Sequence, residues 1–350
     1  MNSHPDRPRG RGATENVPNP FESIRYDIDP GETPGSLPTV VLSDDTQSIV
    51  STNRSPDIPF RYSINPYRGC EHGCSYCYAR PTHQYLGLSA GLDFESKILV
   101  KHDAPELLRR WFARSGYQPE PVMLSGVTDP YQPLESKLRI TQALLEAFWE
   151  HRHPVSVITK NALVLRDLDR LKAMAEHRLV HVAISITTLD PQLARVMEPR
   201  TSTPSARFRA IEMLAEAGVP VRIMTAPVVP GLNDHEIPSL LKSAADAGAK
   251  TAGYVMLRLS DTVRPVFLAW LEQTLPEKAE RVVSAIRSVR DGNLNDTTFR
   301  DRMRGHGQRA EQIASLFKIT AAKYGLLLQS DRLDTGQFRV PGRPKQLDLF

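Results

Sequence analysis

The sequence predicts an α/β fold built on a parallel sheet. From about residue 60 onward, short apolar runs rich in β-branched residues alternate with segments of helical period. The runs are almost continuously apolar, as strands buried on both faces of a parallel sheet are. Repeated units of a strand followed by a helix imply right-handed crossovers between parallel neighbours. The expected strands are 62–64, 122–125, 155–159, 180–186, 221–224 and 254–257.

Three segments between the strands carry signals for helix ends. The stretch 103–106 (Asp-Ala-Pro-Glu) has the pattern of a capping box with an early proline, which predicts a helix that begins there. A second helix is expected from Ser205 to the glycine at 218. Asp234 predicts the amino-terminal cap of a third helix, which ends at Gly248.

The organisation of the chain follows from where these patterns begin and end. We expect a flexible or wrapping arm at 1–59, the α/β domain at 60–260, a helical extension at 261–328 and an extended tail at 329–350. The arm contains the basic run 7–12 and turn-forming residues without a regular period. Two interpretations of the arm stay open, a disordered tail and a segment that touches nucleic acid.

Composition excludes some classes of protein. The chain has 350 residues, 40% of them hydrophobic, and a formal net charge of +4. No apolar run is long enough to span a membrane. So small a net charge is weak evidence for a nucleic-acid partner. Clustered cysteines and the lack of a secretory pattern favour the cytoplasm, where we expect a monomer without a membrane partner.

All three cysteines lie in one short window with the spacing C-x3-C-x2-C, at Cys70, Cys74 and Cys77. Soft sulfur ligands select iron–sulfur clusters, zinc or cuprous copper. Three cysteines would leave one iron of a four-iron cluster without a protein ligand and free to bind a small molecule. A Cys3His zinc site completed by His72 or His83 is the alternative. A disulfide would leave one cysteine over.

Small polar residues follow the expected strands at their carboxyl ends, where parallel sheets and barrels place their chemistry. Because these ends meet at one edge, their side chains could grip a small cofactor, with one lysine suited to a carboxylate or phosphate. The residues are Ser125, Thr128, Asp129, Thr159, Lys160, Ser185 and Thr187.

The cysteine spacing is that of the radical S-adenosylmethionine (radical SAM) superfamily. The flanking stretches 65–70 (Asn-Pro-Tyr-Arg-Gly-Cys) and 76–80 (Tyr-Cys-Tyr-Ala-Arg) resemble the branch related to spore photoproduct lyase, often described as DNA-repair-photolyase-like. The resemblance covers about residues 60–260, and more loosely extends to about 325. Further similar stretches, in the same order, are 125–133, 158–161, 185–188 and 226–234.

The resemblance implies a partial (β/α)6 barrel that is open on one side. It implies a [4Fe-4S] cluster on the three cysteines, with S-adenosylmethionine (SAM) bound to the fourth iron. A one-electron reductant of the flavodoxin or ferredoxin class would load the cluster, and cleavage of SAM would give a 5′-deoxyadenosyl radical that abstracts hydrogen from the substrate. Ser125, Lys160 and Ser185 match family positions that contact the cofactor.

Two tyrosines, Tyr76 and Tyr78, match those that flank the third cysteine in the family, and we assign them a catalytic role. Tyr76 is also a candidate for cofactor binding, together with Thr128, Asp129 and Thr187. An alternative for the tyrosines is that they wall the cluster from water.

The substrate implied by the resemblance is a nucleic-acid base or a DNA lesion. Spore photoproduct lyase uses a further cysteine as hydrogen donor, whereas this chain has three cysteines in all and carries Ser125-Gly126 in that neighbourhood. Either tyrosines take the role or the reaction differs, so we do not expect spore photoproduct itself as the substrate. A radical SAM enzyme on a peptide or small metabolite, and a zinc-stabilised nucleic-acid-binding or adaptor protein, stay open as alternatives.

Two further features bear on DNA. The stretch 281–309 is rich in arginine, and we expect Arg300, Arg302 and Arg304 to contact phosphates, although a solvated helix face explains the same pattern. The chain ends in Gln-Leu-Asp-Leu-Phe, which resembles the motif that docks on the bacterial sliding clamp. A tail packed back on its own barrel is the alternative. The expected clamp contacts are Gln346, Leu347, Leu349 and Phe350.

Overall fold

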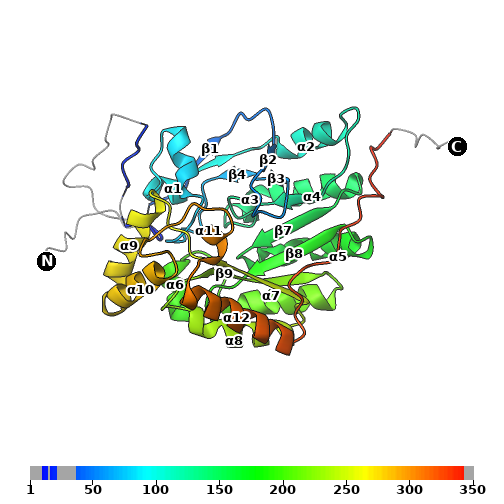
Figure 1. Ribbon diagram of the computed structural model, residues 1–350. Helices are drawn as coiled ribbons and strands as arrows, with labels where there is room; N and C mark the ends of the chain where they lie inside the picture. The colour runs from blue at the N-terminus through cyan, green and yellow to red at the C-terminus, as the bar shows by residue number, and fades with distance from the viewer. Residues whose placement is uncertain (1–9, 15, 22–36, 343–350) are drawn as a thin grey trace.

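Six parallel strands form the centre of the computed structural model, which describes residues 10–14, 16–21 and 37–342 (Figure 1). Each strand pairs with the next one in chain order. A seventh strand, β2 (Val50–Thr52), runs antiparallel to β3 at one edge, and β10 forms the other edge. The two edges do not pair within the described residues, so the barrel is open, as expected. The six strands are β3 (Tyr62–Ile64), β6 (Val122–Leu124), β7 (Val155–Thr159), β8 (Val180–Ser185), β9 (Val221–Val228) and β10 (Thr251–Met256).

Helices connect the strands and pack on the outside of the sheet (Figure 1). Neighbouring helices contact one another and the strands beneath them, as α2 contacts α4 and α7 contacts β8. The longer helices are α2 (Ala104–Phe112), α4 (Ile140–Glu150), α5 (Leu168–Glu176), α7 (Pro204–Glu216) and α8 (Ile237–Asp246). The short ones are η1 (Arg80–Leu86), α1 (Leu92–Ser96), α3 (Glu135–Leu138), η2 (Ala162–Asp167), α6 (Pro191–Met197) and η3 (Asp234–Glu236).

Two of the expected helix caps differ from the structure. Asp103 precedes α2, but its side chain makes no capping hydrogen bond. Helix α8 begins at Ile237, three residues after Asp234. Asp234 instead accepts a hydrogen bond from the Gly231 N–H at 3.1 Å and pairs with Arg309 at 3.0 Å. Short polar side chains bond equally well to a nearby turn, and here the turn after β9 competes with the cap.

A second, three-stranded sheet was not predicted. It contains β1 (Val40–Ser43), β5 (Lys97–Val100) and β4 (Tyr67–Arg68), with β5 in the middle. The segment 37–59 therefore contributes β1 to one sheet and β2 to the other, rather than forming only irregular structure. Both strands are short, and β1 pairs with β5 far along the chain, so no local period marks them.

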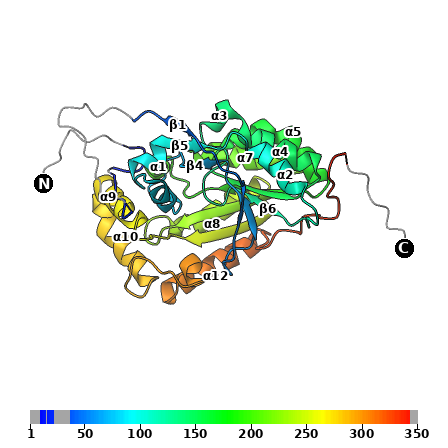
Figure 2. The ribbon, with the colours of Figure 1, turned by 90° about the horizontal axis from the view of Figure 1, so that it is seen from above.

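The helical extension lies after β10. Helices α9 and α10 pack together and gather at one end of the molecule in both views, and α12 lies beside α8 (Figures 1 and 2). Phe267 and Trp270 of α9 belong to the same apolar cluster as Cys74 and Tyr76. The extension therefore covers the loop that carries the cysteines. Its helices are α9 (Val263–Thr274), α10 (Pro276–Ser288), α11 (Asp301–Arg304) and α12 (Gln308–Lys323). None of the helices in the described part of the chain is long and apolar enough to cross a membrane.

A buried histidine beside α2 gives the fold a pH dependence. The His153 ring stacks on Phe112 with 4.3 Å between centroids, and its nitrogens lie 2.9 Å from the Pro154 carbonyl and 2.8 Å from the Tyr117 hydroxyl. Burial lowers the pKa of His153 to about 3. The folded ring is therefore neutral, with Nδ1–H donating to the carbonyl and Nε2 accepting from the tyrosine.

We expect the unfolding free energy to fall as the pH decreases from about 6.5 toward 3, because the unfolded chain takes up a proton that folded His153 does not. The slope for this one group approaches about 1.4 kcal/mol per pH unit. In His153→Phe, denaturant melts at pH 7, 6, 5 and 4 should show a correspondingly smaller slope than in the wild type. The exposed His102→Phe is the control, and equal slopes in all three proteins would contradict the assignment.

Candidate active site around the cysteine loop

The cysteine loop follows β3 and the short strand β4, near the carboxyl end of the first barrel strand. Gly69 has a left-handed backbone with φ +85°, and a side chain there would meet His83 and Phe94. The Cys70 N–H donates to the Phe94 carbonyl at 2.9 Å. Cys70 and Cys74 are buried, Cys77 is half-buried, and all three are free thiols. The loop thus presents three sulfurs from a fixed backbone.

Burial raises the pKa of two of these thiols, Cys74 and Cys77. Burial, with a smaller contribution from Cys70, raises the pKa of Cys77 to about 11. The pKa of Cys74 also lies well above its usual range, because of burial and the nearby Glu198 carboxylate. Bound metal cations reverse such shifts, because they stabilise the thiolate. Three free thiols clustered on one loop fit a soft, multiply charged metal group.

The two candidate fourth ligands for zinc already have other partners in the protein. His72 Nδ1 faces Asp129 at 3.4 Å, and His83 Nε2 lies 2.9 Å from the Lys97 carbonyl. Across the described ranges, no three His, Cys, Asp or Glu side chains are placed to hold one metal ion. In a four-iron cluster each cysteine binds a different iron, so the sulfurs need not meet at a single point. His72 also interacts with Cys70, so the Cys3His alternative stays a prediction for metal analysis to test.

Lys160 joins the ends of three neighbouring strands. Lys160 follows β7 directly. Its Nζ donates to Ser185 Oγ at 2.8 Å, to Thr187 Oγ1 at 3.1 Å and to the Ala226 carbonyl at 2.8 Å. Ser185 ends β8, and Ala226 lies in β9. The structure thus brings together three residues that the sequence singled out separately, because parallel strands end at the same edge.

The sequence reasoning missed the carboxylate at the centre of this group. Glu198, just after α6, pairs with Lys160 at 3.0 Å and with Arg207 at 2.5 Å, and it accepts hydrogen bonds from Thr187 and from the Tyr76 hydroxyl. The side chains of Glu198 and Arg207 are each 1% exposed. Nothing local marks either residue, since a glutamate after a helix and an arginine on one ordinarily face solvent.

Two cations set the charge of this buried group. Burial alone would raise the pKa of Glu198, but the Arg207 guanidinium and the Lys160 ammonium hold it well below its usual range. The carboxylate is therefore ionised. Arg207 is held further by the Ser185 carbonyl at 2.8 Å and the Ser202 carbonyl at 2.7 Å. The result is a rigid, charged wall beside the cysteine loop.

Asp129 and Thr128 serve as braces for the backbone. Asp129 accepts from Thr159 Oγ1 at 2.7 Å, from the Lys160 N–H at 2.8 Å and from the Tyr131 N–H at 2.9 Å. Thr128 Oγ1 donates to the Tyr67 carbonyl at 2.9 Å. These bonds tie the loop after β6 to β7 and to the cysteine loop. Both side chains thus support the site through hydrogen bonds inside the protein, and their assignment to cofactor binding stays a prediction.

Ser125 has a strained backbone conformation. It follows β6 directly with φ +72°, a left-handed conformation that costs energy for any residue other than glycine, and it is buried. Its N–H donates to the Ile64 carbonyl at 3.0 Å. Such strain persists where the surrounding structure requires a side chain in that place.

The two tyrosines of the loop lie in different environments. The Tyr76 hydroxyl is sequestered with Glu198 and Thr187, and its pKa is raised well above its usual range by burial. Tyr78 is 53% exposed and donates to the Gly126 carbonyl at 2.7 Å. Of the two, Tyr78 is the one that a substrate could reach.

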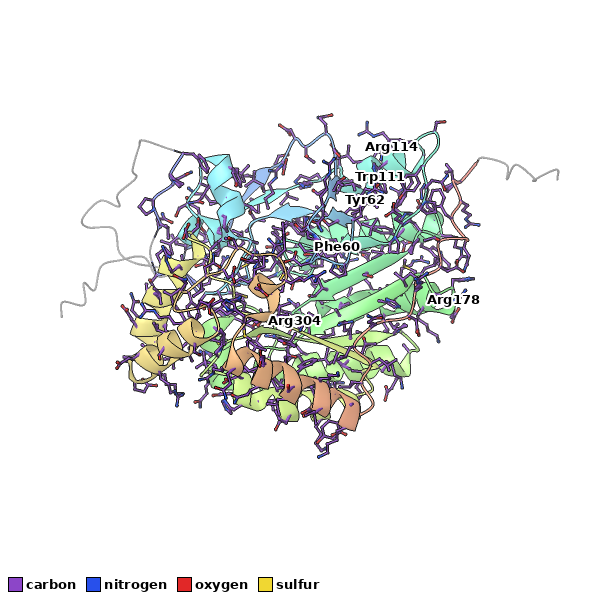
Figure 3. The ribbon with its side chains drawn as sticks, viewed as in Figure 1. Phe60, Tyr62, Trp111, Arg114, Arg178 and Arg304 are labelled. Carbon is purple, nitrogen blue, oxygen red and sulfur yellow. The ribbon has the colours of Figure 1, made fainter. Side chains whose placement is uncertain are left out.

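The three arginines expected to bind phosphates also differ in exposure: one is paired with a carboxylate and two are exposed. Arg302 makes a bidentate pair with Asp57 at 2.6 and 2.5 Å. Arg300 and Arg304 are exposed, and the Arg304 guanidinium lies 4.2 Å from the centroid of the Tyr254 ring. Figure 3 places Arg304 at α11, away from the stack of Tyr62, Trp111 and Arg114. The clamp contacts expected at Gln346, Leu347, Leu349 and Phe350 lie outside the described residues.

Comparison with known proteins defines the class to which this fold and cysteine loop belong. The model of the radical SAM superfamily matches residues 64–244, more than half of the chain. The chain therefore belongs to the radical SAM superfamily.

Individual relatives agree with this assignment. The chain is 36% identical over 272 residues to the uncharacterized protein Rv2578c of Mycobacterium tuberculosis, covering 77% of this chain and 76% of that one. It is 28% identical over 220 residues to the uncharacterized protein MJ0683 of Methanocaldococcus jannaschii, covering 63% and 78%. A spore photoproduct lyase variant with bound AdoMet and dinucleoside spore photoproduct shares the fold, with a TM-score of 0.55, 17% identity and 88% coverage of each chain.

Proposed function

We propose that this protein is a radical SAM enzyme that holds a [4Fe-4S] cluster on Cys70, Cys74 and Cys77, binds SAM and acts on a nucleic-acid base or DNA lesion. The observation that carries the proposal is the juxtaposition of three free thiols with a charged polar wall at the carboxyl ends of the barrel strands. When bound, such a cluster and SAM supply a one-electron cleavage that yields a hydrogen-abstracting radical. An external reductant of the flavodoxin or ferredoxin class completes the electron balance.

The residues of the chain bind, orient and exclude water. Lys160, with Ser185 beside it, would bind the carboxylate of SAM as a point charge with a hydroxyl. Glu198 would hold the Lys160 ammonium in place. Tyr76, which is hydrogen-bonded to Glu198, would close the cysteine loop against solvent. Cys74 and Tyr76 already pack in the apolar cluster of the helical extension, so water is excluded from that side.

A nucleic-acid substrate is favoured by the exposed groups near this site. Tyr78 offers an accessible ring close to the Arg258 guanidinium, which lies 5.8 Å from its centroid, and aromatic rings with arginines suit stacked bases and phosphates. The shared fold with spore photoproduct lyase supports the same class. A peptide or small metabolite remains the second candidate, since superfamily membership does not select the substrate. The sliding-clamp partner remains a proposal from the sequence of the last five residues.

The proposal is tested by the metal content and reactivity of protein purified without oxygen. We expect about four irons and four sulfides per chain, and formation of methionine and 5′-deoxyadenosine from SAM when a strong reductant is added. One zinc per chain without sulfide, even after reconstitution with iron and sulfide, would overturn the proposal in favour of a structural zinc site.

Arg304, which is exposed, should contribute to DNA affinity, whereas Arg302, which is paired with Asp57, should not. We expect Arg304→Ala to weaken binding of a DNA duplex. The slope of log K against log salt is negative, and its magnitude should decrease by about 1. Arg302→Ala should leave that slope unchanged. It should reduce stability, because it removes the ionic partner of Asp57, whose side chain is 3% exposed. Fluorescence anisotropy at three salt concentrations measures both. An effect of equal size from the two variants would contradict this division.

A further inference from the structure

The amino-terminal segment Gly10–Ala13 lies against the cysteine loop, far from where its sequence suggests. Its basic, glycine-rich composition is typical of a solvated arm, yet Gly12 and Ala13 are buried and the Arg11 side chain is 14% exposed. Ala13 packs with Leu92 and Val266, from α1 and α9. The segment is therefore enclosed between the cysteine loop and the helical extension.

A buried carboxylate holds the backbone of this segment. Glu95 of α1 is 1% exposed and accepts the N–H groups of three successive residues, Arg11 at 2.5 Å, Gly12 at 3.2 Å and Ala13 at 3.3 Å. Three backbone donors that converge on one carboxyl group form a directional anchor. An unstructured arm would not bury such a set of polar groups.

The same carboxylate connects the segment to a ligand cysteine. Arg80, fully buried, donates from Nη2 to Glu95 Oε2 at 3.0 Å and to the Cys74 carbonyl at 2.9 Å. A continuous chain of charged hydrogen bonds thus runs from the backbone at Gly12 through Glu95 and Arg80 to the peptide group of Cys74. A shift of the segment would move the acceptor that positions Arg80.

The backbones also touch directly. A Cβ atom built on Gly12 would lie 1.8 Å from the Gly73 carbonyl oxygen, and one built on Gly73 would lie 2.4 Å from the Arg11 Cβ. Both distances are far below van der Waals contact, so glycine is required on each side. A second attachment reaches the residue after Cys70, since Arg11 donates to Thr39 at 2.7 Å and Thr39 donates to Glu71 at 2.6 Å.

We propose that Gly10–Ala13 is a strap that holds the cysteine loop in its ligand-binding shape and covers it from solvent, with Glu95 as the positioning residue. The strap contacts the loop between the first two cysteines, where glycines at 12 and 73 let the two backbones approach closely. Its role follows from these contacts and rests on the proposed function only in that the loop carries a cluster. A cluster beneath it would be shielded from water and oxidants.

Hydrogen exchange on the unmodified, full-length protein is the first test. We expect the amides of Arg11, Gly12 and Ala13 to exchange at least about a hundredfold more slowly than in an unstructured peptide. Exchange at the unstructured rate would overturn the proposal. The measurement needs no cluster, so its failure is distinct from the finding of zinc or no sulfide, which would overturn the proposed function.

Thiol labelling tests the coupling to the loop. In metal-free full-length protein, Glu95→Gln and Gly12→Val should raise the rate at which a maleimide modifies Cys74 by about tenfold, because opening of the strap exposes the loop. Glu150→Gln, which removes a surface carboxylate from a bidentate pair with Arg109, is the matched control. Deletion of residues 2–9 should leave the rate unchanged, whereas deletion of 2–14 should raise it.

Labelling rates of Cys74 distinguish a strap from a segment that has no effect on the cysteine loop. Rates for Glu95→Gln and the 2–14 deletion within twofold of the wild type would overturn the proposal. If these variants unfold, the exchange test on the wild type decides the outcome. Rescue provides the last discriminating readout: a synthetic peptide of residues 1–21 added to the 2–14 deletion should slow labelling of Cys74, and no slowing at millimolar peptide would count against the strap.

Discussion

Replacement of Cys74 by alanine is expected to remove the iron–sulfur cluster and to lower the rate of reductive SAM cleavage by about a thousandfold or more, which corresponds to about 4 kcal/mol of activation free energy. Cys74 is the middle cysteine of the loop and is buried beside Glu198 and Lys160. Two remaining thiols would leave a second iron without a protein ligand, and such a cluster is lost readily. Iron, sulfide and the visible absorption of the cluster report its loss directly.

The matched control is the neighbouring serine. Ser75 is fully buried and its hydroxyl has no hydrogen-bond partner in the described structure. Ser75→Ala therefore changes the same loop by one atom without removing a metal ligand, and it should keep the full iron content. Retention of about four irons by Cys74→Ala, or equal loss in both variants, would contradict the assignment of Cys74 as a ligand.

Replacement of the buried Glu198 is expected to have the largest effect on the free energy of unfolding. Glu198→Ala leaves the Arg207 guanidinium without its ionic partner at a site that is 1% exposed. Loss of one member of a buried pair costs about 3–5 kcal/mol. The exposed Glu212→Ala on α7 is the control and should be close to neutral. Urea denaturation of the three proteins at pH 7 measures the difference.

The pH dependence of that stabilisation has a definite sign. The pKa of folded Glu198 lies below its usual value of about 4.5, so the unfolded chain binds the proton first as the pH falls. The contribution is therefore full above about pH 5 and is lost as the pH falls through the folded pKa. A loss of stability in Glu198→Ala that grows toward acid pH would contradict this.

Lys160 separates cofactor binding from folding. Its side chain is 16% exposed, whereas that of its partner Glu198 is 1% exposed. We expect Lys160→Met to weaken SAM binding by about tenfold to a hundredfold, as loss of a charged hydrogen bond does. Its cost in stability should be smaller than that of Glu198→Ala. Equal SAM affinity in Lys160→Met and the wild type would remove Lys160 from the binding site.

Much of the barrel was predictable because its strands are local patterns. The runs at 155–159 and 180–186 are apolar for several residues in succession, and they became β7 and β8 with nearly the expected bounds. The short strands β1 and β2 were not, since β1 pairs with β5 far along the chain and β2 has only three residues. The caps at Asp103 and Asp234 failed for a local reason, as nearby turns or solvent satisfied those carboxylates instead.

The candidate site divides along the same line. Cysteine spacing, the radical SAM resemblance and the strand-end residues Lys160 and Ser185 are all written in short stretches of sequence, and they determined the class of protein. The partners that charge and seal the site come from other stretches. Glu198 and Arg207 meet Lys160 only because β7, β8 and the helices after them converge, and Glu95 meets Gly12 only because the arm folds back over α1. Such pairs leave no local signal, since a charged side chain reads as solvated until the tertiary structure buries it beside its counterion.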